Sequence, residues 1–154
     1  MTRWATGVAV ITSRAEDGPR GATTNAMTSL SLDPLLVLVC LDRSSNTLDA
    51  IRSSGRFCVN ILSADQEELA RRFATKASGH EKLAGVAHET IDGVPVLRGI
   101  LAWLACELDR EVDGGDHAIL IGRPMESGVD ADAEPLVFYG GRYHAASLGL
   151  HGEP

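Results

Sequence analysis

One stretch of the sequence, residues 22–34, gathers hydrogen-bonding side chains that could contact a ligand. It carries six hydroxyl or amide side chains among small apolar residues, and its only charge, Asp33, lies near its end. Neutral donors and acceptors of this kind suit the edge of a flat heteroaromatic ligand. An ordinary Ser/Thr-rich strand and turn, in which the hydroxyls bond to nearby backbone groups, would use the same residues. Spacing alone leaves both interpretations open.

A second candidate is the segment 42–47, which immediately precedes a short predicted helix. The first N–H groups of a helix have no partner within the helix. Together with the hydroxyls of this segment and Arg43 they would form an anion site that suits a phosphate. Plain N-capping by Asn46, with Asp49 three residues further on, is the alternative.

The third candidate is the run from Gly114 to His117, which places a histidine beside a glycine turn. His117 could contact a ligand, or it could be a solvated loop residue. The five histidines lie in different segments without close ligand spacing, so we predict no metal site. The sequence has no G-x-G-x-x-G, P-loop, H-E-x-x-H or G-x-S-x-G motif. This argues against Rossmann dinucleotide enzymes, P-loop hydrolases, zincins and α/β-hydrolases.

Length and charge restrict the class of protein further. The chain has 154 residues and a mass of 16.3 kDa, so we expect a single domain over residues 1–154. A formal charge of -7 argues against binding to nucleic acid or to anionic membrane surfaces. The longest strongly apolar run, residues 34–41, is too short to span a bilayer, and the N-terminal residues lack the apolar region of a secretory signal. We therefore expect a cytoplasmic protein, in which Cys40, Cys58 and Cys106 act as small hydrophobes.

Segments rich in β-branched and aliphatic residues must position these candidates. We predict strands over residues 7–13, 35–41, 57–62, 100–112, 118–122 and 136–139. Leu104, Cys106 and Leu108 alternate with acidic residues, a pattern typical of a strand with one buried and one solvated face. Residues 113–116 are then expected to form a hairpin turn.

Two short helices are predicted between the strands. One covers residues 64–74 and follows the capping-box spacing of Ser63 and Gln66, and the other covers residues 47–54 and ends at Gly55. Helices this few and short, among strands joined by tight turns, predict an antiparallel barrel with helical insertions.

Taken in order, several segments resemble the flavin reductase family, small NAD(P)H-dependent enzymes that supply reduced flavin to two-component monooxygenases. The resemblance covers nearly the whole chain and rests on residues 5–12, 29–34, 55–62, 66, 72–74, 114–117, 121–122 and 135–139. Each fragment alone is weak, but the ordered set is specific. It favours the ligand interpretation at all three candidate segments.

The resemblance implies a mainly β fold, a split β-barrel of Greek-key type with a few short helices. It also implies a homodimer that binds one flavin, FMN or FAD, per subunit near the interface. Carried over by position, the resemblance places five residues at the flavin ring: Thr24, Asn25, Ala26, Met27 and Ser29. It assigns Ser45, Asn46 and Thr47 to the phosphate turn, and gives Asn60, Phe73 and Lys76 as weaker matches around the flavin. His117 corresponds to the nicotinamide contact, and Tyr143 borders the same cleft. Only four residues precede Ala5, fewer than members usually carry, so an arm or helix that covers the flavin is expected to be missing.

The reaction implied is hydride transfer from C4 of NADH or NADPH to N5 of FMN or FAD, with the reduced flavin passing to a separate oxygenase component. The protein then has to hold two rings at reactive distance, and no acid or base residue is obligatory. Two alternatives stay open. One is a flavin-binding split-barrel carrier or sensor without turnover, and the other is a flavin oxidase of the pyridoxamine phosphate type. In the oxidase, Arg142 and nearby His144 would have to bind the substrate phosphate.

Overall fold

The computed structural model describes residues 2–75 and 79–146, which form twelve strands and three helices. The strands are β1 (Thr6–Gly7), β2 (Ala9–Ala15), β3 (Gly18–Thr24), β4 (Met27–Leu32), β5 (Leu35–Asp42), β6 (Arg56–Ile61), β7 (His88–Ile91), β8 (Val94–Leu97), β9 (Ala102–Gly114), β10 (His117–Val129), β11 (Leu136–Tyr139) and β12 (Arg142–Ala145). The helices are α1 (Asn46–Ser54), α2 (Glu67–Phe73) and α3 (Gly79–Leu83).

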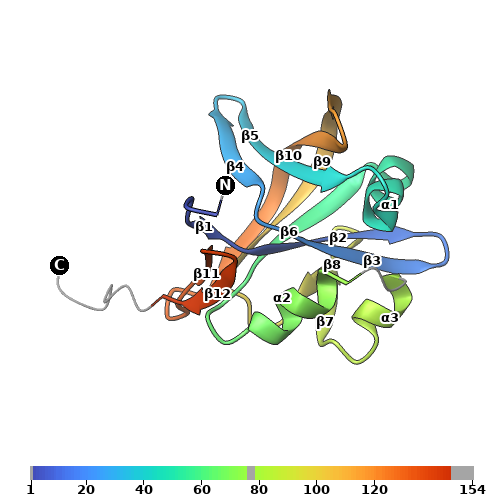
Figure 1. Ribbon diagram of the computed structural model, residues 1–154. Coiled ribbons are helices and arrows are strands. Elements are labelled where there is room, and N and C mark those ends of the chain that lie inside the picture. Colours follow the sequence, from blue (N-terminus) through green and yellow to red (C-terminus); the bar gives the residue numbers. More distant parts are fainter. Residues whose placement is uncertain (1, 76–78, 147–154) are drawn as a thin grey trace.

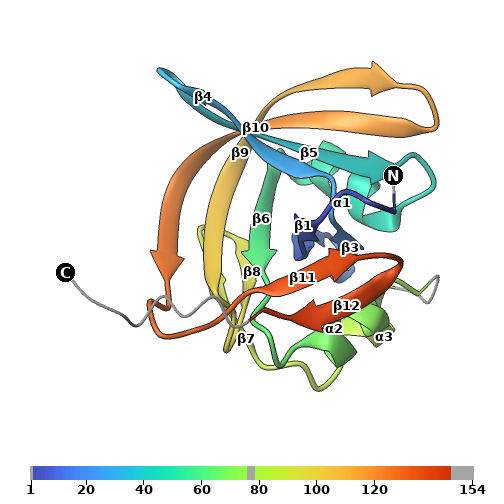
Figure 2. The ribbon, with the colours of Figure 1, turned by 60° about the vertical axis from the view of Figure 1, so that its left-hand side comes forward.

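Seven of the strands form one sheet in the order β3-β2-β6-β9-β10-β5-β4. A second sheet has the order β1-β11-β12, and β7 pairs with β8. The hairpins β4–β5 and β9–β10 project from one end of the molecule, whereas α2 and α3 lie near the other (Figures 1 and 2). All strand pairs among the described residues are antiparallel, which confirms the predicted mainly β fold with a few short helices.

The segment that follows β3 brings the two sides of the large sheet together. Thr24, the last residue of β3, donates a hydrogen bond from Oγ1 to the carbonyl oxygen of Cys40 in β5, at 3.2 Å. The N–H of Cys40 donates to the carbonyl oxygen of Ala26, at 2.9 Å. Since β3 and β5 lie near opposite ends of the strand order, these bonds curl the sheet into the expected barrel.

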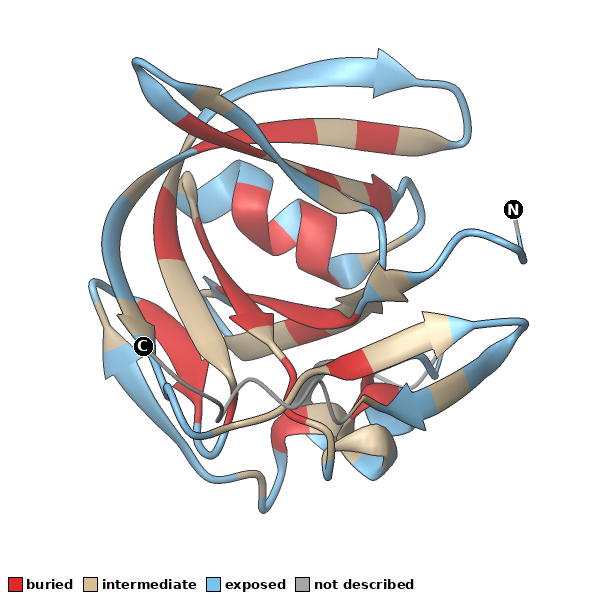
Figure 3. Cartoon of the chain, turned by 90° about the vertical axis from the view of Figure 1, so that its left-hand side faces the viewer, coloured by how far each residue is buried: buried red, intermediate tan, exposed pale blue. Residues whose placement is uncertain are grey.

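Both faces of the central strands are buried, and a helix covers each face. Val10 of β2 lies in an apolar cluster with Phe73 of α2, and the next residue, Ile11, lies in a second cluster with Leu48 and Ile51 of α1. Figure 3 shows the buried residues of α1 beside those of the central strands. Because successive side chains of a strand point to opposite faces, β2 and the neighbouring β6 fix both helices relative to the same sheet.

The three cysteines contribute to this packing as thiols. Cys58 and Cys106 are buried, Cys40 is partly buried, and all three are free. Burial raises the pKa of Cys106 to about 12 and also raises the pKa of the Cys58 thiol. Both therefore stay protonated near neutral pH, as expected for small hydrophobes.

All six predicted strands are present, but several boundaries differ. β10 extends to Val129, far beyond the predicted end at residue 122, because its second half pairs with the first half of β9. The prediction of one solvated face for β9 is wrong in that half, where Ala105 is only 1% exposed and packs in the first cluster. The six predicted strands do not include β3, β4, β7, β8 or β12, and they do not separate β1 from β2.

The helix predicted over residues 64–74 begins three residues late, at Glu67. The side chain of Gln66 accepts from the N–H of Ser63, as a capping box requires, but the Ser63 hydroxyl donates to Asp65 and to the carbonyl oxygen of Gly99. The Ser63 hydroxyl therefore does not cap the first turn of the helix, and residues 64–66 form a turn before it. No helix within the described part of the chain is long and apolar enough to cross a membrane.

Candidate functional site

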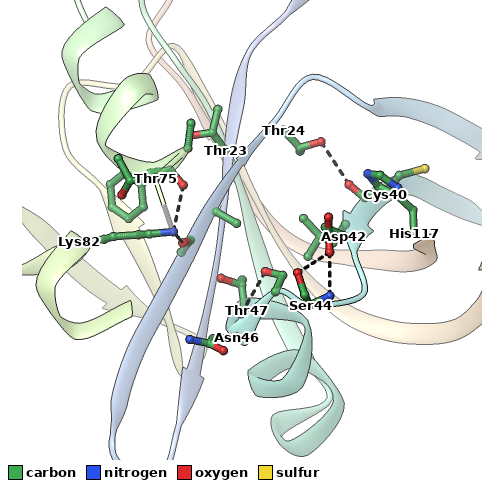
Figure 4. A pocket seen from close by; sticks show the side chains of 16 residues that line it. Thr23, Thr24, Cys40, Asp42, Ser44, Asn46, Thr47, Thr75, Lys82 and His117 are labelled. Atoms are coloured by element: carbon green, nitrogen blue, oxygen red, sulfur yellow. Dashed lines mark hydrogen bonds between the residues drawn. The ribbon is translucent and has the colours of Figure 1, made fainter. Parts of the chain in front are cut away.

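Two neighbouring pockets lie where the barrel closes. The first, here the polar pocket, has a volume of about 440 Å³ and is lined by Thr23, Thr24, Cys40, Asp42, Ser44, Ser45, Asn46, Thr47, Phe73, Thr75, Lys82, His117 and nearby backbone (Figure 4). The second, here the apolar pocket, has a volume of about 580 Å³ and is lined by Thr2, Trp4, Thr6, Asn25, Ala26, Met27, Thr28, Leu38, Cys40 and Phe138. Cys40 forms part of both walls, so the two pockets adjoin.

The start of α1 forms one wall of the polar pocket. Ser45 is the N-cap, and its Oγ accepts a hydrogen bond from the N–H of Thr47 at 3.3 Å. The carboxylate of Asp42 accepts from both the N–H and the Oγ of Ser44, which fixes the turn before the helix. N-capping by Asn46 is therefore wrong, because Asn46 is the first helical residue and its amide lies at the pocket. At the other end, Gly55 adopts a φ of 69° and ends the helix as predicted.

Lys82 on α3 brings the one ammonium group among the described lining residues to the polar pocket. Its Nζ donates to the carbonyl oxygens of Phe73, at 3.2 Å, and Gly21, at 3.4 Å, and burial lowers its pKa. Lys82 is not among the residues predicted from the sequence; the predicted lysine, Lys76, lies outside the described residues. No local pattern marks Lys82, because its place in the site depends on α3 packing against β3.

Phe73 at the end of α2 closes the polar pocket next to Lys82. Its ring is 1% exposed and lies directly on β3, where a Cβ on Gly21 would come within 2.5 Å of the ring atom Cε1. Only glycine leaves room for the ring at this position. Phe73, which the family resemblance placed near the flavin, therefore supports the pocket wall and the core together.

His117 lies on the opposite wall, at the first position of β10, and is paired in register with Asp42, the last residue of β5. Its Nδ1 is 2.8 Å from Oδ1 of Asp116. In the tautomer with its hydrogen on Nδ1, His117 donates to this carboxylate and Nε2 is left as an acceptor. The side chain is 44% exposed, so a ligand in the pocket can reach it.

The apolar pocket contains three of the predicted ring contacts, Asn25, Ala26 and Met27, while Thr24 lies in the polar pocket. Thr24 Oγ1 also accepts from the N–H of Ala26, so its hydroxyl is engaged in the turn after β3. Apart from the Asn25 amide and some threonines, the walls of this pocket are largely apolar. This composition suits a flat, weakly polar ring.

Three predicted site residues do not line either pocket. Ser29 is exposed on β4. Asn60 is fully buried, and its amide donates to Val10 and Thr12 and accepts from the N–H of Leu97, so it ties three strands together. Tyr143 packs against Phe138, which lines the apolar pocket, and Arg71 lies over its ring. Burial raises the pKa of the Tyr143 hydroxyl.

Arg142 and His144, which the oxidase alternative needs beside a substrate phosphate, are exposed on β12 and line neither pocket. The basic group that does reach the polar pocket is Lys82, opposite the N–H groups and hydroxyls at the start of α1. This donor set suits a phosphate, and the adjoining apolar walls suit a ring.

Known proteins resemble this chain in sequence over most of its length. The chain matches the model of the "Flavin reductase like domain" over residues 1–147. It is 38% identical over 145 residues to a flavin reductase of Pseudomonas putida, covering 93% of this chain and 84% of the relative. It is also 38% identical over 147 residues to HsaB, the reductase subunit of a flavin-dependent monooxygenase of Mycobacterium tuberculosis, covering 93% of this chain and 77% of the relative.

Solved structures of such proteins have the same fold. The NADH:FAD oxidoreductase SgcE6 of Streptomyces globisporus, in complex with NAD and FAD fragments, superposes with a TM-score of 0.88 at 32% identity. The match covers 96% of this chain and 88% of that one. The predicted split-barrel fold is thereby confirmed.

Proposed function

Since the chain belongs to the flavin reductase-like family, we propose that it is an NAD(P)H:flavin oxidoreductase that supplies reduced FMN or FAD to a separate monooxygenase. The observation that carries this proposal is the junction of the two pockets. A phosphate-type donor set, an apolar ring pocket and His117 all lie around Cys40 and the end of β5.

The start of α1 would hold the flavin phosphate. Ser45 keeps a free hydroxyl hydrogen after accepting from Thr47, and the Asn46 amide and the Thr47 side chain line the same wall. The helix N-terminus and the Lys82 ammonium both favour an anion there.

The segment Thr24–Met27 and the walls of the apolar pocket would hold the flavin ring. The Asn25 amide can donate to or accept from the polar edge of the ring, and Met27 supplies apolar contact. When bound, the flavin supplies an N5 atom that accepts a hydride from C4 of the nicotinamide. The protein excludes water from the ring and holds the two partners in position.

His117 orients the nicotinamide. With Nδ1 donating to Asp116, the Nε2 lone pair can accept from the carboxamide N–H₂ group of NADH or NADPH. Hydride transfer needs no proton from the protein at this step, so His117 acts by position.

We also propose that the chain functions as a homodimer with the apolar pocket near the interface. Large apolar side chains lie exposed at Leu32, Val129 and Trp4, with exposed fractions of 85%, 76% and 67%. Trp4 lines the apolar pocket, so a second subunit that covers Trp4 would also cover that pocket.

The test is anaerobic mixing of the purified protein with FMN or FAD and then with NADH or NADPH. We expect binding of the oxidised flavin, loss of its visible absorbance on addition of the nicotinamide nucleotide, and passage of the reduced flavin through an ultrafiltration membrane. Flavin binding without bleaching by either nucleotide would favour the carrier alternative. Bleaching by pyridoxamine phosphate and not by NADH or NADPH would favour the oxidase.

A further inference from the structure

Arg43 lies between the phosphate turn and the strand position that is paired with His117, and it lines neither pocket. It directly follows Asp42, the residue of β5 that is paired with His117, and it precedes Ser44 and Ser45 of the phosphate turn. Arg43 is therefore the first residue after the β5–β10 ladder ends.

Three groups of Arg43 contact the turn that connects β9 to β10. Its N–H donates to the carbonyl oxygen of Asp116 at 3.1 Å, its Nε donates to the carbonyl oxygen of Gly115 at 2.7 Å, and its Nη2 pairs with the carboxylate of Asp113. The same carboxylate accepts from the N–H of Gly115 at 3.0 Å. The side chain of Arg43 thus holds Gly115 of the turn and Asp113 at the end of β9, while its backbone N–H holds Asp116, the residue before His117.

Other support for this turn is sparse. The last residues of β9, from Asp109 to Gly114, are exposed, and Gly115 has a φ of 80°. A hairpin end with exposed hydrogen bonds and little apolar packing opens easily. The planar guanidinium binds a carbonyl and a carboxylate together, which a single point charge cannot do as well.

We propose that Arg43 is a positioning residue that fixes His117 relative to the phosphate turn, so that a nicotinamide bound at His117 meets a flavin bound at α1. This inference rests on the proposed function of His117. It assigns Arg43 no contact with either nucleotide.

The test compares Arg43→Ala with a matched control, Arg52→Ala. Arg52 of α1 pairs with Glu111 of the same β9 strand, through Nε at 3.0 Å and Nη2 at 2.7 Å, but does not touch the turn. The side chains of Arg43 and Arg52 are similarly exposed, at 41% and 38%, so both variants remove one positive charge from a comparable environment. Steady-state kinetics with NADH, flavin titration and thermal unfolding are measured for both.

We expect Arg43→Ala to raise the KM for NADH about three- to tenfold with a smaller change in kcat, and Arg52→Ala to change it less than about twofold. Flavin affinity should hold in both variants, because Ser45 and Asp42 organise the phosphate turn without the Arg43 side chain. Arg43→Lys keeps the charge but not the planar geometry, so its KM should remain raised.

A double-mutant cycle with His117→Ala separates positioning from a general effect. If Arg43 acts through His117, Arg43→Ala adds no further loss to His117→Ala. Equal effects of the Arg43 and Arg52 variants, or additive losses in the cycle, would overturn the proposal for Arg43 while leaving that for His117 intact. A His117→Ala enzyme with unchanged NADH kinetics would refute the role of His117 itself, and the proposal for Arg43 would fail with it.

Discussion

Replacing Lys82 by alanine should weaken the binding of flavin nucleotides but not of riboflavin. Lys82 is on the short helix α3, yet its Nζ reaches the polar pocket opposite the start of α1. Riboflavin has the same ring as FMN and lacks the phosphate. The difference between the two ligands therefore isolates the contact that the ammonium makes with the phosphate.

The size of the effect follows from the hydrogen bonds of the ammonium group. An ammonium has three hydrogens to donate. The carbonyl oxygens of Phe73 and Gly21 take two of them, which leaves one for a phosphate oxygen. One charge-assisted bond contributes about 1.5 kcal/mol at such a partly exposed site, so the Kd for FMN should rise about tenfold.

The pH dependence gives a second measurement on the same residue. Burial lowers the pKa of Lys82, so the ammonium loses its proton at a pH below the ordinary lysine value of about 10.4. A phosphate binds the protonated form better, so FMN affinity is greatest below this lowered pKa and falls as pH rises through it. In Lys82→Arg the charge persists, and the fall should be absent.

The assay is fluorescence titration of the wild-type, Lys82→Ala and Lys82→Arg proteins with FMN and with riboflavin, between neutral and alkaline pH. Riboflavin also corrects for ionisation of the ring itself. Unchanged FMN affinity in Lys82→Ala would refute the assignment of Lys82 to the phosphate. Equal losses for FMN and riboflavin would mean that Lys82 supports the wall formed by Phe73 and not the phosphate.

Three further predictions concern the phosphate turn, the core and the assembly. Ser45→Ala combined with Thr47→Ala should weaken FMN binding by about 1–2 kcal/mol per lost charge-assisted bond, and unchanged affinity in the same titration would reduce Ser45 to a helix cap. Asn60→Ala should lower the free energy of unfolding, measured in urea, by about 2–4 kcal/mol, because three buried hydrogen bonds are lost. The folded fraction should bind flavin normally. Lost flavin affinity without lost stability would show that Asn60 contacts the flavin. Light scattering should give twice the 16.3 kDa mass of one chain, and a flavin-loaded single chain would rule out an interface site.

The sequence predicted the parts of this protein that local patterns determine. The alternation at Leu104, Cys106 and Leu108 identified β9, because those side chains do pack in one cluster. Gly55 marked the end of α1, since a positive φ there requires glycine. The start of α1 and His117, both candidates from the sequence, line the same polar pocket.

The errors have a common physical origin, which is that long-range contacts override local signals. β3 carries glycine, proline and polar residues that disfavour a strand, and it forms because β2 pairs along its whole length. Asn60 was expected near the flavin through the family resemblance, but three partners from other segments bind its amide. Lys82 lies 61 residues from Gly21, whose carbonyl oxygen it contacts, so no spacing could indicate it.

The pairing of β5 with β10 has a consequence for how this protein can change in length over evolution. β5 and β10 pair without a register shift, from Val37 opposite Gly122 to Asp42 opposite His117. The irregularities in β10 lie beyond Ile121 and concern its pairing with β9. One residue inserted in β5 would move the phosphate turn by about 3.4 Å relative to His117 and turn each following side chain to the other face. Point substitutions can therefore accumulate along this ladder, whereas insertions and deletions should be confined to turns such as residues 130–134, where added length leaves the spacing of Ser45 and His117 unchanged.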